Sequence, residues 1–197
     1  MTFKIKLEPK AQVEPIEKVV TDEYKLWLGD CLELMPNIES ESVDLILTDL
    51  PYEVSQNHWD SMIPLDQLWK EYNRIIKPNG AIVLFGSQPF TTKLIASNLK
   101  NYKYQWYWKK NKPSNHLNAK RQPLRNIEDI CVFYKRQPTY NPQMVKRDVA
   151  ITGTDTGTQT TYGATKGGHT KTYTHKYPVN LLEYSRDTQP HPTQKPV

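Results

Sequence analysis

The stretch that most constrains the fold is residues 43–52, VDLILTDLPY. Its first half is short, apolar and rich in β-branched residues, which is typical of a buried strand rather than a helix. An acid, a proline and an aromatic residue follow at once. In open α/β sheets ligands bind beyond the carboxyl ends of the strands, so we expect Asp49, Pro51 and Tyr52 to lie at a functional edge. A strand end followed by an ordinary turn proline is the alternative interpretation.

The rest of the first 135 residues alternates between strand and helix patterns. A short strand at 25–28 precedes a helical turn at 31–35, and residues 65–77 place their apolar side chains on one helical face. A second parallel strand is expected at 81–85, a helix at 89–99, and further strands at 104–108 and 129–134. This alternation predicts a doubly wound α/β sheet.

The charge of this 197-residue chain is unevenly distributed. Residues 1–60 carry 13 acids and 5 bases, whereas residues 61–197 carry 8 acids and 21 bases. The length indicates one domain with room for a small inserted lobe. A basic lobe favours a polyanionic partner, and a merely solvated surface is the alternative.

The basic residues cluster between positions 103 and 125, a stretch without a single acid. Lysines and arginines of this kind bind phosphates, while arginines and the interspersed Asn115 and Asn118 are suited to base edges. We therefore expect a DNA-binding segment with a steep loss of affinity as salt is added. Its candidate contact residues are Lys109, Lys110, Lys112, His116, Lys120, Arg121 and Arg125.

The two cysteines, Cys31 and Cys131, fall in or beside apolar segments, which predicts reduced, buried thiols in a cytoplasmic protein. Neither cysteine has the spacing of a zinc site, and we expect no metal. The first twelve residues lack the apolar core of a signal peptide, and no apolar run approaches membrane-spanning length. Export and membrane insertion are therefore not expected.

Four segments resemble, in order, the β-type (permuted) amino DNA methyltransferases, the N6-adenine/N4-cytosine DNA methylase family. They are residues 48–60 (TDLPYEVSQNHWD), 79–90 (NGAIVLFGSQPF), 115–121 (NHLNAKR) and 191–197 (HPTQKPV). The sequence departs from the family pattern in two ways. Leu50 replaces the first proline of the Asp-Pro-Pro-Tyr signature, and the sequence stops where the glycine-rich cofactor loop should begin. We expect a fragment of a longer protein; supply of the missing part from elsewhere, or loss of catalysis, are the alternatives.

The resemblance implies a Rossmann-like, doubly wound sheet of the S-adenosylmethionine-dependent methyltransferase type, incomplete at its C-terminal end. It divides the chain into a flexible N-terminal arm (1–22), a catalytic core (23–135), a loop-rich target-recognition insertion (136–186) and the start of a cofactor-binding motif (187–197). Residues 152–175 have almost no aliphatic side chains and cannot build a core, so we expect weak order there.

The function implied by the resemblance is methyl transfer from S-adenosylmethionine to the N6 amino group of adenine in double-stranded DNA. The Asp49 carboxylate and the Pro51 carbonyl would accept the two amino hydrogen bonds. Tyr52 would offer an aromatic face to a base taken out of the stack. The resemblance assigns to the cofactor Asp30, Asp49, His191, Pro192, Thr193, Gln194 and Lys195. Asp30 is also suited to cap a helix.

Several alternatives stay open from the sequence. N4-cytosine methylation and a non-catalytic DNA-binding fragment are the rival functions, and the acid at position 49 favours adenine by resemblance. Trp106 and Trp108 share one strand face and either stack on a flipped base or pack in the core. A restriction endonuclease partner and a homodimer are further expectations for an enzyme of restriction-modification or phage type.

Overall fold

The structure is a computed structural model that describes residues 14–52, 61–155, 157, 159–160, 163–164 and 167–184. The chain divides into two compact units. The first unit comprises residues 1–139 and 181–197, and the second comprises residues 140–180. Each unit is described by itself.

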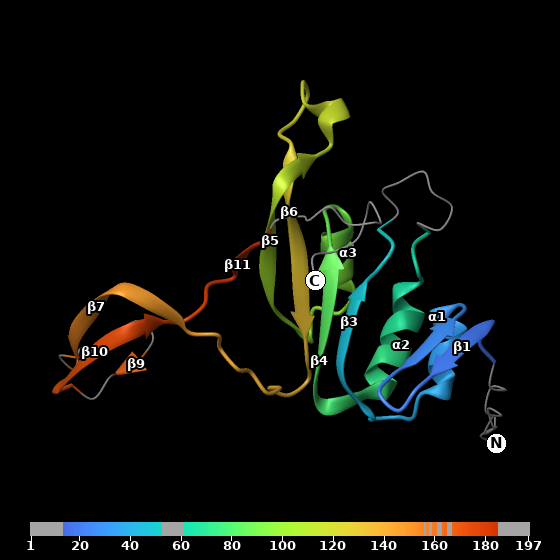
Figure 1. The fold of residues 1–197 in the computed structure, drawn as a ribbon, viewed down its shortest axis with the longest axis horizontal. Coiled ribbons are helices and arrows are strands. Elements are labelled where there is room, and N and C mark those ends of the chain that lie inside the picture. The colour runs from blue at the N-terminus through green and yellow to red at the C-terminus, as the bar shows by residue number, and fades with distance from the viewer. Residues whose placement is uncertain are drawn as a thin grey trace, which may run out of the picture. The chain divides into compact units, whose positions relative to one another are not determined.

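The first unit is built on a mixed five-stranded sheet in the order β11-β5-β6-β4-β3 (Figure 1). β3 runs parallel to β4 and β11 parallel to β5, whereas β6 is antiparallel to both of its neighbours. The predicted α/β class and the predicted parallel pair are thus confirmed. The strands are β3 (Val43–Asp49), β4 (Ile76–Gly86), β5 (Tyr102–Ser114), β6 (Arg125–Phe133) and β11 (Leu181–Glu183).

Two helices, α2 (Leu65–Ile75) and α3 (Phe90–Ser97), supply the second layer. Leu68 of α2 and Leu94 of α3 are fully buried in one core cluster with Leu84 of β4. The predicted helix at 65–77 ends two residues early, because Ile76 is already extended and begins β4. None of the helices in the described part of the chain is long and apolar enough to cross a membrane.

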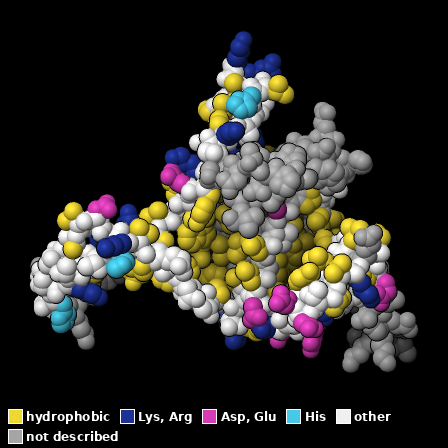
Figure 2. Space-filling model, viewed as in Figure 1, with side chains coloured by type: hydrophobic (Ala, Val, Ile, Leu, Met, Phe, Trp, Pro, Cys, Tyr) yellow, Lys and Arg dark blue, Asp and Glu magenta, His cyan; other side chains and the backbone are white. Residues whose placement is uncertain are grey.

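The opposite face of the sheet is apolar and has no described helix upon it. Side chains alternate between the two faces of a strand, so Leu45 and Leu47 point away from the core that Ile46 joins. Both leucines are more than half exposed. The side of the molecule shown in Figure 2 is accordingly broadly apolar over the sheet. Of the two layers of helices that a doubly wound sheet carries, the described residues supply one.

The N-terminal part differs from the predicted flexible arm. β1 (Glu17–Val20) pairs antiparallel with β2 (Lys25–Leu28). The Thr21 hydroxyl oxygen accepts a bond of 3.0 Å from the Tyr24 backbone N–H and so closes the turn between them. Residues 17–20 are therefore in a hairpin, while residues 1–13 lie outside the described part. The predicted turn at 31–35 is α1 (Cys31–Leu34), followed by the 3₁₀ helix η1 (Met35–Asn37).

The second unit is a two-stranded ribbon of β7 (Val145–Asp155) and β10 (His169–Lys176), with the short strands β8 (Gln159–Thr160) and β9 (Gly163–Ala164). The sequence patterning predicts weak order at 152–175, whereas the structure pairs much of this stretch. Cross-strand hydroxyl pairs join Thr152 to Thr172 at 3.1 Å and Thr154 to Thr170 at 3.0 Å. Threonine favours extended backbone, and because β10 is exposed on both faces it lacks an apolar alternation.

Candidate active site

The predicted catalytic loop lies at the carboxyl end of β3. Asp49 is the last residue of the strand and pairs with Phe85 of the parallel neighbour β4. Leu50, which stands where the family has proline, is buried and belongs to the core cluster. Pro51 and Tyr52 are half-buried. Leu50 thus anchors the loop to the core by packing, while its neighbours remain at the sheet edge.

Tyr52 connects this loop to Asp49 and to helix α3. Its hydroxyl donates a hydrogen bond of 2.5 Å to Asp49 Oδ1, and its ring stacks on Phe90 with centroids 5.2 Å apart. Burial raises the pKa of the Tyr52 phenol far above its ordinary value, and the bond to the Asp49 carboxylate raises it further. Tyr52 is therefore a neutral donor that orients the carboxylate.

Phe90 is a site residue that the sequence reasoning missed. It lies in the family-like stretch 79–90, but nothing in its local pattern indicates contact with Tyr52. The contact arises because α3 begins just after β4, beside the end of β3. Only the parallel pairing of the two strands brings these aromatic rings together.

Asp30 and Pro51, two of the predicted site residues, line the same open cavity of about 290 Å³. Asp30 Oδ1 accepts a 2.7 Å bond from the Leu32 N–H, so the residue caps α1 as the alternative interpretation proposed. Ligand pockets usually span about 300–1,000 Å³, so this cavity has room for part of a nucleoside-sized molecule. Its remaining walls are Cys31, Leu32, Ser61, Met62, Ile63 and Pro64.

The two cysteines differ in exposure. Cys131 in β6 is fully buried, and burial together with the charge of Asp129 raises its pKa to about 12. Cys31 is exposed, so the prediction that both thiols are buried is wrong for this residue. It follows Asp30 at the first turn of α1, beside an open cavity, and not in the core.

The two tryptophans of β5 also differ. Trp108 is 2% exposed, and its indole N–H donates to the Tyr184 carbonyl at 3.1 Å, so the packing interpretation holds for it. Trp106 is half-buried and meets the ring of Tyr104 edge to face at 6.4 Å.

The predicted DNA-binding residues lie on the hairpin that joins β5 to β6, which we call the basic hairpin (residues 109–125). It projects beyond the ends of β3 and β4 (Figure 1), and Lys and Arg side chains gather at its tip (Figure 2). Lys112, Lys120 and Arg121 are exposed there. Arg125, at the base, donates to the Gln88 carbonyl at 3.0 Å.

Two of the predicted contact lysines have carboxylate partners. Lys110 is only 8% exposed and forms a 2.9 Å ion pair with Glu128. Its ammonium group is therefore buried against a carboxylate and is not exposed for contact with a DNA phosphate. We therefore remove Lys110 from the candidate DNA contacts. Lys109 pairs with Glu183 at 2.6 Å but remains half-exposed, and a pair of this kind is easily exchanged for another anion.

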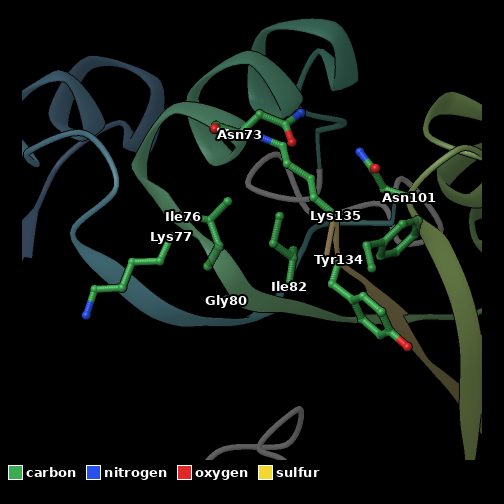
Figure 3. A pocket seen from close by; sticks show the side chains of 9 residues that line it. Asn73, Ile76, Lys77, Gly80, Ile82, Asn101, Tyr134 and Lys135 are labelled. Atoms are coloured by element: carbon green, nitrogen blue, oxygen red, sulfur yellow. Dashed lines mark hydrogen bonds between the residues drawn. The ribbon is translucent and has the colours of Figure 1, made fainter. Parts of the chain in front are cut away.

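A second, much smaller pocket lies at the other end of the sheet (Figure 3). Its side chains come from the end of α2, the start of β4 and the end of β6, including Asn73, Ile76 and Tyr134. Its volume of about 10 Å³ is close to the least that a single water needs. This volume is too small for a substrate or cofactor.

The predicted cofactor residues 191–195 lie outside the described part of the chain. Within the described ranges, no three His, Cys, Asp or Glu side chains gather closely enough to hold a metal ion. The structure thus brings together Asp30, Asp49, Pro51 and Tyr52 of the predicted site.

The sheet with its acid-proline-aromatic loop fits the N6-adenine/N4-cytosine DNA methylase family. The sequence model of this family matches residues 43–197, and the chain belongs to it. The chain is 27% identical over 187 residues to the DNA adenine methyltransferase YhdJ of Escherichia coli, covering 85% of this chain and 62% of that protein. It is 23% identical over 203 residues to the type II methyltransferase M.HpaI of Haemophilus parainfluenzae, and the match covers 88% of this chain and 56% of that protein.

The fold agrees with this assignment. The solved structure of the PvuII DNA methyltransferase, a cytosine-N4-specific enzyme, superimposes with a TM-score of 0.51 at 15% identity, covering 84% of this chain and 58% of that one. The predicted methyltransferase fold is thereby confirmed. The chain spans about three fifths of the length of the relatives that it matches.

Proposed function

We propose that this chain carries the catalytic loop of an S-adenosylmethionine-dependent DNA methyltransferase that modifies the N6 amino group of adenine. The observation that carries the proposal is the position of Asp49, Pro51 and Tyr52. They follow a buried parallel strand, and Pro51 opens onto the cavity that Asp30 also lines. Membership of the DNA methylase family supports the reaction class.

Asp49 and Pro51 supply the acceptors that this chemistry needs. The lone pair of an adenine amino group is delocalised into the ring, so the nitrogen is a poor nucleophile. Acceptors for both amino protons draw the nitrogen toward tetrahedral geometry and localise the lone pair. The Asp49 carboxylate takes one proton's bond and the Pro51 carbonyl takes the other, on a backbone that the proline ring stiffens.

Tyr52 and Phe90 position these acceptors. A carboxylate accepts up to about four hydrogen bonds, so the bond from Tyr52 is compatible with a second one from the substrate. The hydrogen bond from Tyr52 restrains the rotation of the Asp49 carboxylate. Phe90 covers one face of the Tyr52 ring, and a base taken out of the duplex would stack on the opposite face.

The cavity beside the loop fits part of the cofactor. Its apolar wall of Met62, Ile63 and Pro64 suits a purine or thioether, and the Asp30 carboxylate suits hydroxyl donors of a ribose. Bound S-adenosylmethionine would supply an electrophilic methyl group. The amino nitrogen would take this methyl as the methyl–sulfur bond broke with its electron pair staying on sulfur, and Asp49 or water would accept the proton that the nitrogen loses. His191 to Lys195 join the proposed cofactor site by family resemblance.

Adenine is preferred over cytosine for two reasons. The aspartate at position 49 resembles the adenine-modifying members of the family, whose cytosine-modifying members more often have serine there. The relative YhdJ is named a DNA adenine methyltransferase. The PvuII enzyme, which modifies cytosine N4, shares the fold at lower identity and makes cytosine the alternative base.

Product analysis tests the proposal directly. The chain is incubated with isotopically labelled S-adenosylmethionine and mixed-sequence DNA, and the digested nucleosides are identified by mass spectrometry. Labelled N6-methyldeoxyadenosine is the expected product. Labelled N4-methyldeoxycytidine would show that the target base is cytosine and not adenine. The absence of label, with DNA binding intact, would contradict catalysis by this length of chain.

A non-catalytic DNA-binding role is the second candidate, and the basic hairpin favours it. That hairpin lies wholly within the described residues and needs no cofactor to bind phosphates. Titration calorimetry separates the two candidates. The enzyme binds S-adenosylmethionine in the absence of DNA, whereas a protein that only binds DNA releases no heat with the cofactor.

A further inference from the structure

The tip of the basic hairpin presents a bare leucine to solvent. Leu117 is 101% exposed, more than any other large apolar side chain in the described ranges, of which Ile16 comes next at 79%. A single exposed leucine needs no explanation by itself. Leu117 is unusual because of how it is held, what surrounds it and where the hairpin points.

The tip is a hydrogen-bonded turn that holds the leucine outward. Residues His116–Asn118 form the 3₁₀ helix η2, entered through Asn115 in the left-handed conformation with φ of 72°. The Asn118 side-chain amide donates to Asn115 Oδ1 at 2.8 Å, and the Asn118 N–H donates to the Asn115 carbonyl at 3.1 Å. The Ala119 N–H adds a bond of 3.1 Å to the His116 carbonyl. These bonds fix the backbone on both sides of Leu117.

The surroundings of Leu117 are cationic. Lys112, Lys120 and Arg121 are exposed near the tip, and the sequence from 109 to 125 contains no acid. Figure 2 shows the basic side chains at the end of the projection. Cations of this kind neutralise phosphates and bring a duplex against the tip, where an apolar side chain gains nothing from phosphate. It gains from contact with the faces of bases.

The hairpin leaves the sheet at the edge that carries the catalytic loop. Asp49 pairs with Phe85, and Phe85 pairs with Ile130. Trp106 of β5 also pairs with Ile130, so these four residues form one row across the sheet at the level of Asp49, which we call the catalytic row. Beyond this row β5 runs parallel to β3 as far as Ser114. At 3.3 Å per residue this continuation reaches up to about 26 Å beyond the catalytic row. The major groove is about 8.5 Å deep, so the tip is long enough to enter a duplex whose base reaches Asp49.

We propose that Leu117 is a wedge that enters the base stack of double-stranded DNA beside the nucleotide that leaves it. The inference rests on the proposed function, since an enzyme that extrudes its target base opens a gap in the stack that such a wedge would fill. Extrusion leaves a gap in the stack, and an apolar side chain that fills it favours the open duplex. Leucine is among the side chains that intercalate between base steps. Leu117 acts on the equilibrium of extrusion and not on the methyl transfer.

Fluorescence of 2-aminopurine tests the wedge. Mixed-sequence duplexes with adenines partly replaced by 2-aminopurine become brighter when the base leaves the stack. With saturating wild-type protein we expect a rise, and with Leu117→Ala we expect most of that rise to be lost. Leu117→Met, which keeps the apolar volume, should restore it. Leu99→Ala is the matched control, because Leu99 is 66% exposed and lies outside the hairpin.

Binding to damaged DNA provides the second readout. Leu117→Ala should bind an intact duplex about tenfold more weakly than the wild type, and a duplex with an abasic gap at most about twofold more weakly, because the gap removes the unstacking cost. A fluorescence rise unchanged by Leu117→Ala would refute the wedge alone. The absence of any rise with the wild-type protein would refute the wedge together with the proposed function.

Discussion

Asp49 and Asp44 lie on the same strand, but only Asp49 reaches the proposed catalytic loop. We expect Asp49→Asn to lower the methyl-transfer rate at least about a hundredfold, because the amide presents a donor where the substrate amino group needs an acceptor. Asp44→Asn is the control. It loses an exposed ion pair with Lys77, worth at most about 1 kcal/mol, and should keep its activity. Single-turnover assays with labelled S-adenosylmethionine give both rates, and equal rates in the two variants would contradict the role of Asp49.

The two thiols should differ in reactivity. An aromatic disulfide reagent should modify Cys31 in the folded protein and spare Cys131, because Cys31 is exposed whereas Cys131 is buried. Partial burial and the charge of Asp30 raise the pKa of Cys31, so its reaction should be slower than that of a free thiol, while the pKa of about 12 keeps Cys131 protonated. Colorimetric titration should therefore find one reactive thiol in native buffer and two in concentrated urea. Cys31→Ser should leave none in native buffer. Two fast-reacting thiols in the native wild type would show that β6 opens readily.

Sequence patterning identified local residues of the site better than distant pairs. Asp49, Pro51 and Tyr52 follow one strand and were placed together from that strand alone. The ion pair of Lys110 with Glu128 was missed, because the acid belongs to the returning strand of the hairpin and lies outside the acid-free stretch. Neighbouring lysines look alike in sequence, and only strand pairing decides which one is buried.

Strand β4 contains a glycine that its neighbours require. A Cβ at Gly80 would lie 2.9 Å from the Asp44 carbonyl oxygen of β3 and 2.8 Å from Ile76 side-chain atoms. Gly80→Ala should therefore lower the free energy of unfolding by about 1–3 kcal/mol. In Gly153→Ala the nearest atom is at 3.5 Å, so the change should stay within about 0.5 kcal/mol. Urea unfolding followed by circular dichroism measures both, and similar losses would contradict the tight contact at Gly80.

Strand and helix types were predictable in the core, but their ends were not. The predicted strands at 104–108 and 129–134 are the apolar parts of β5 and β6. Both strands extend farther into the basic hairpin, where polar residues such as Lys112 have no apolar alternation to reveal them. The ribbon of β7 and β10 was missed for the same reason. Backbone pairing continues into exposed parts of these strands, whereas an alternation of apolar and polar residues marks only the parts with one buried face.

The binding of the whole molecule to DNA should depend steeply on salt. Each phosphate contact contributes about 0.9 to the slope of log affinity against log salt. Replacing Lys112, Lys120 and Arg121 together by alanine should reduce that slope by about 2 to 3. Lys70→Ala, on the exposed side of α2, should leave it unchanged. Fluorescence anisotropy at several salt concentrations gives the slopes, and a triple variant with the wild-type slope would exclude the basic hairpin as the contact surface.

The division of the chain into two units separates the residues that form the core of the sheet from residues 140–180, which contribute nothing described to that core. None of the described residues between Tyr140 and Asn180 belongs to the core cluster that supports Asp49 and its loop. Mutations in the ribbon therefore carry little penalty for the stability of the sheet. Selection for a stable sheet therefore places few constraints on residues 140–180, whereas it constrains the strands that position Asp49.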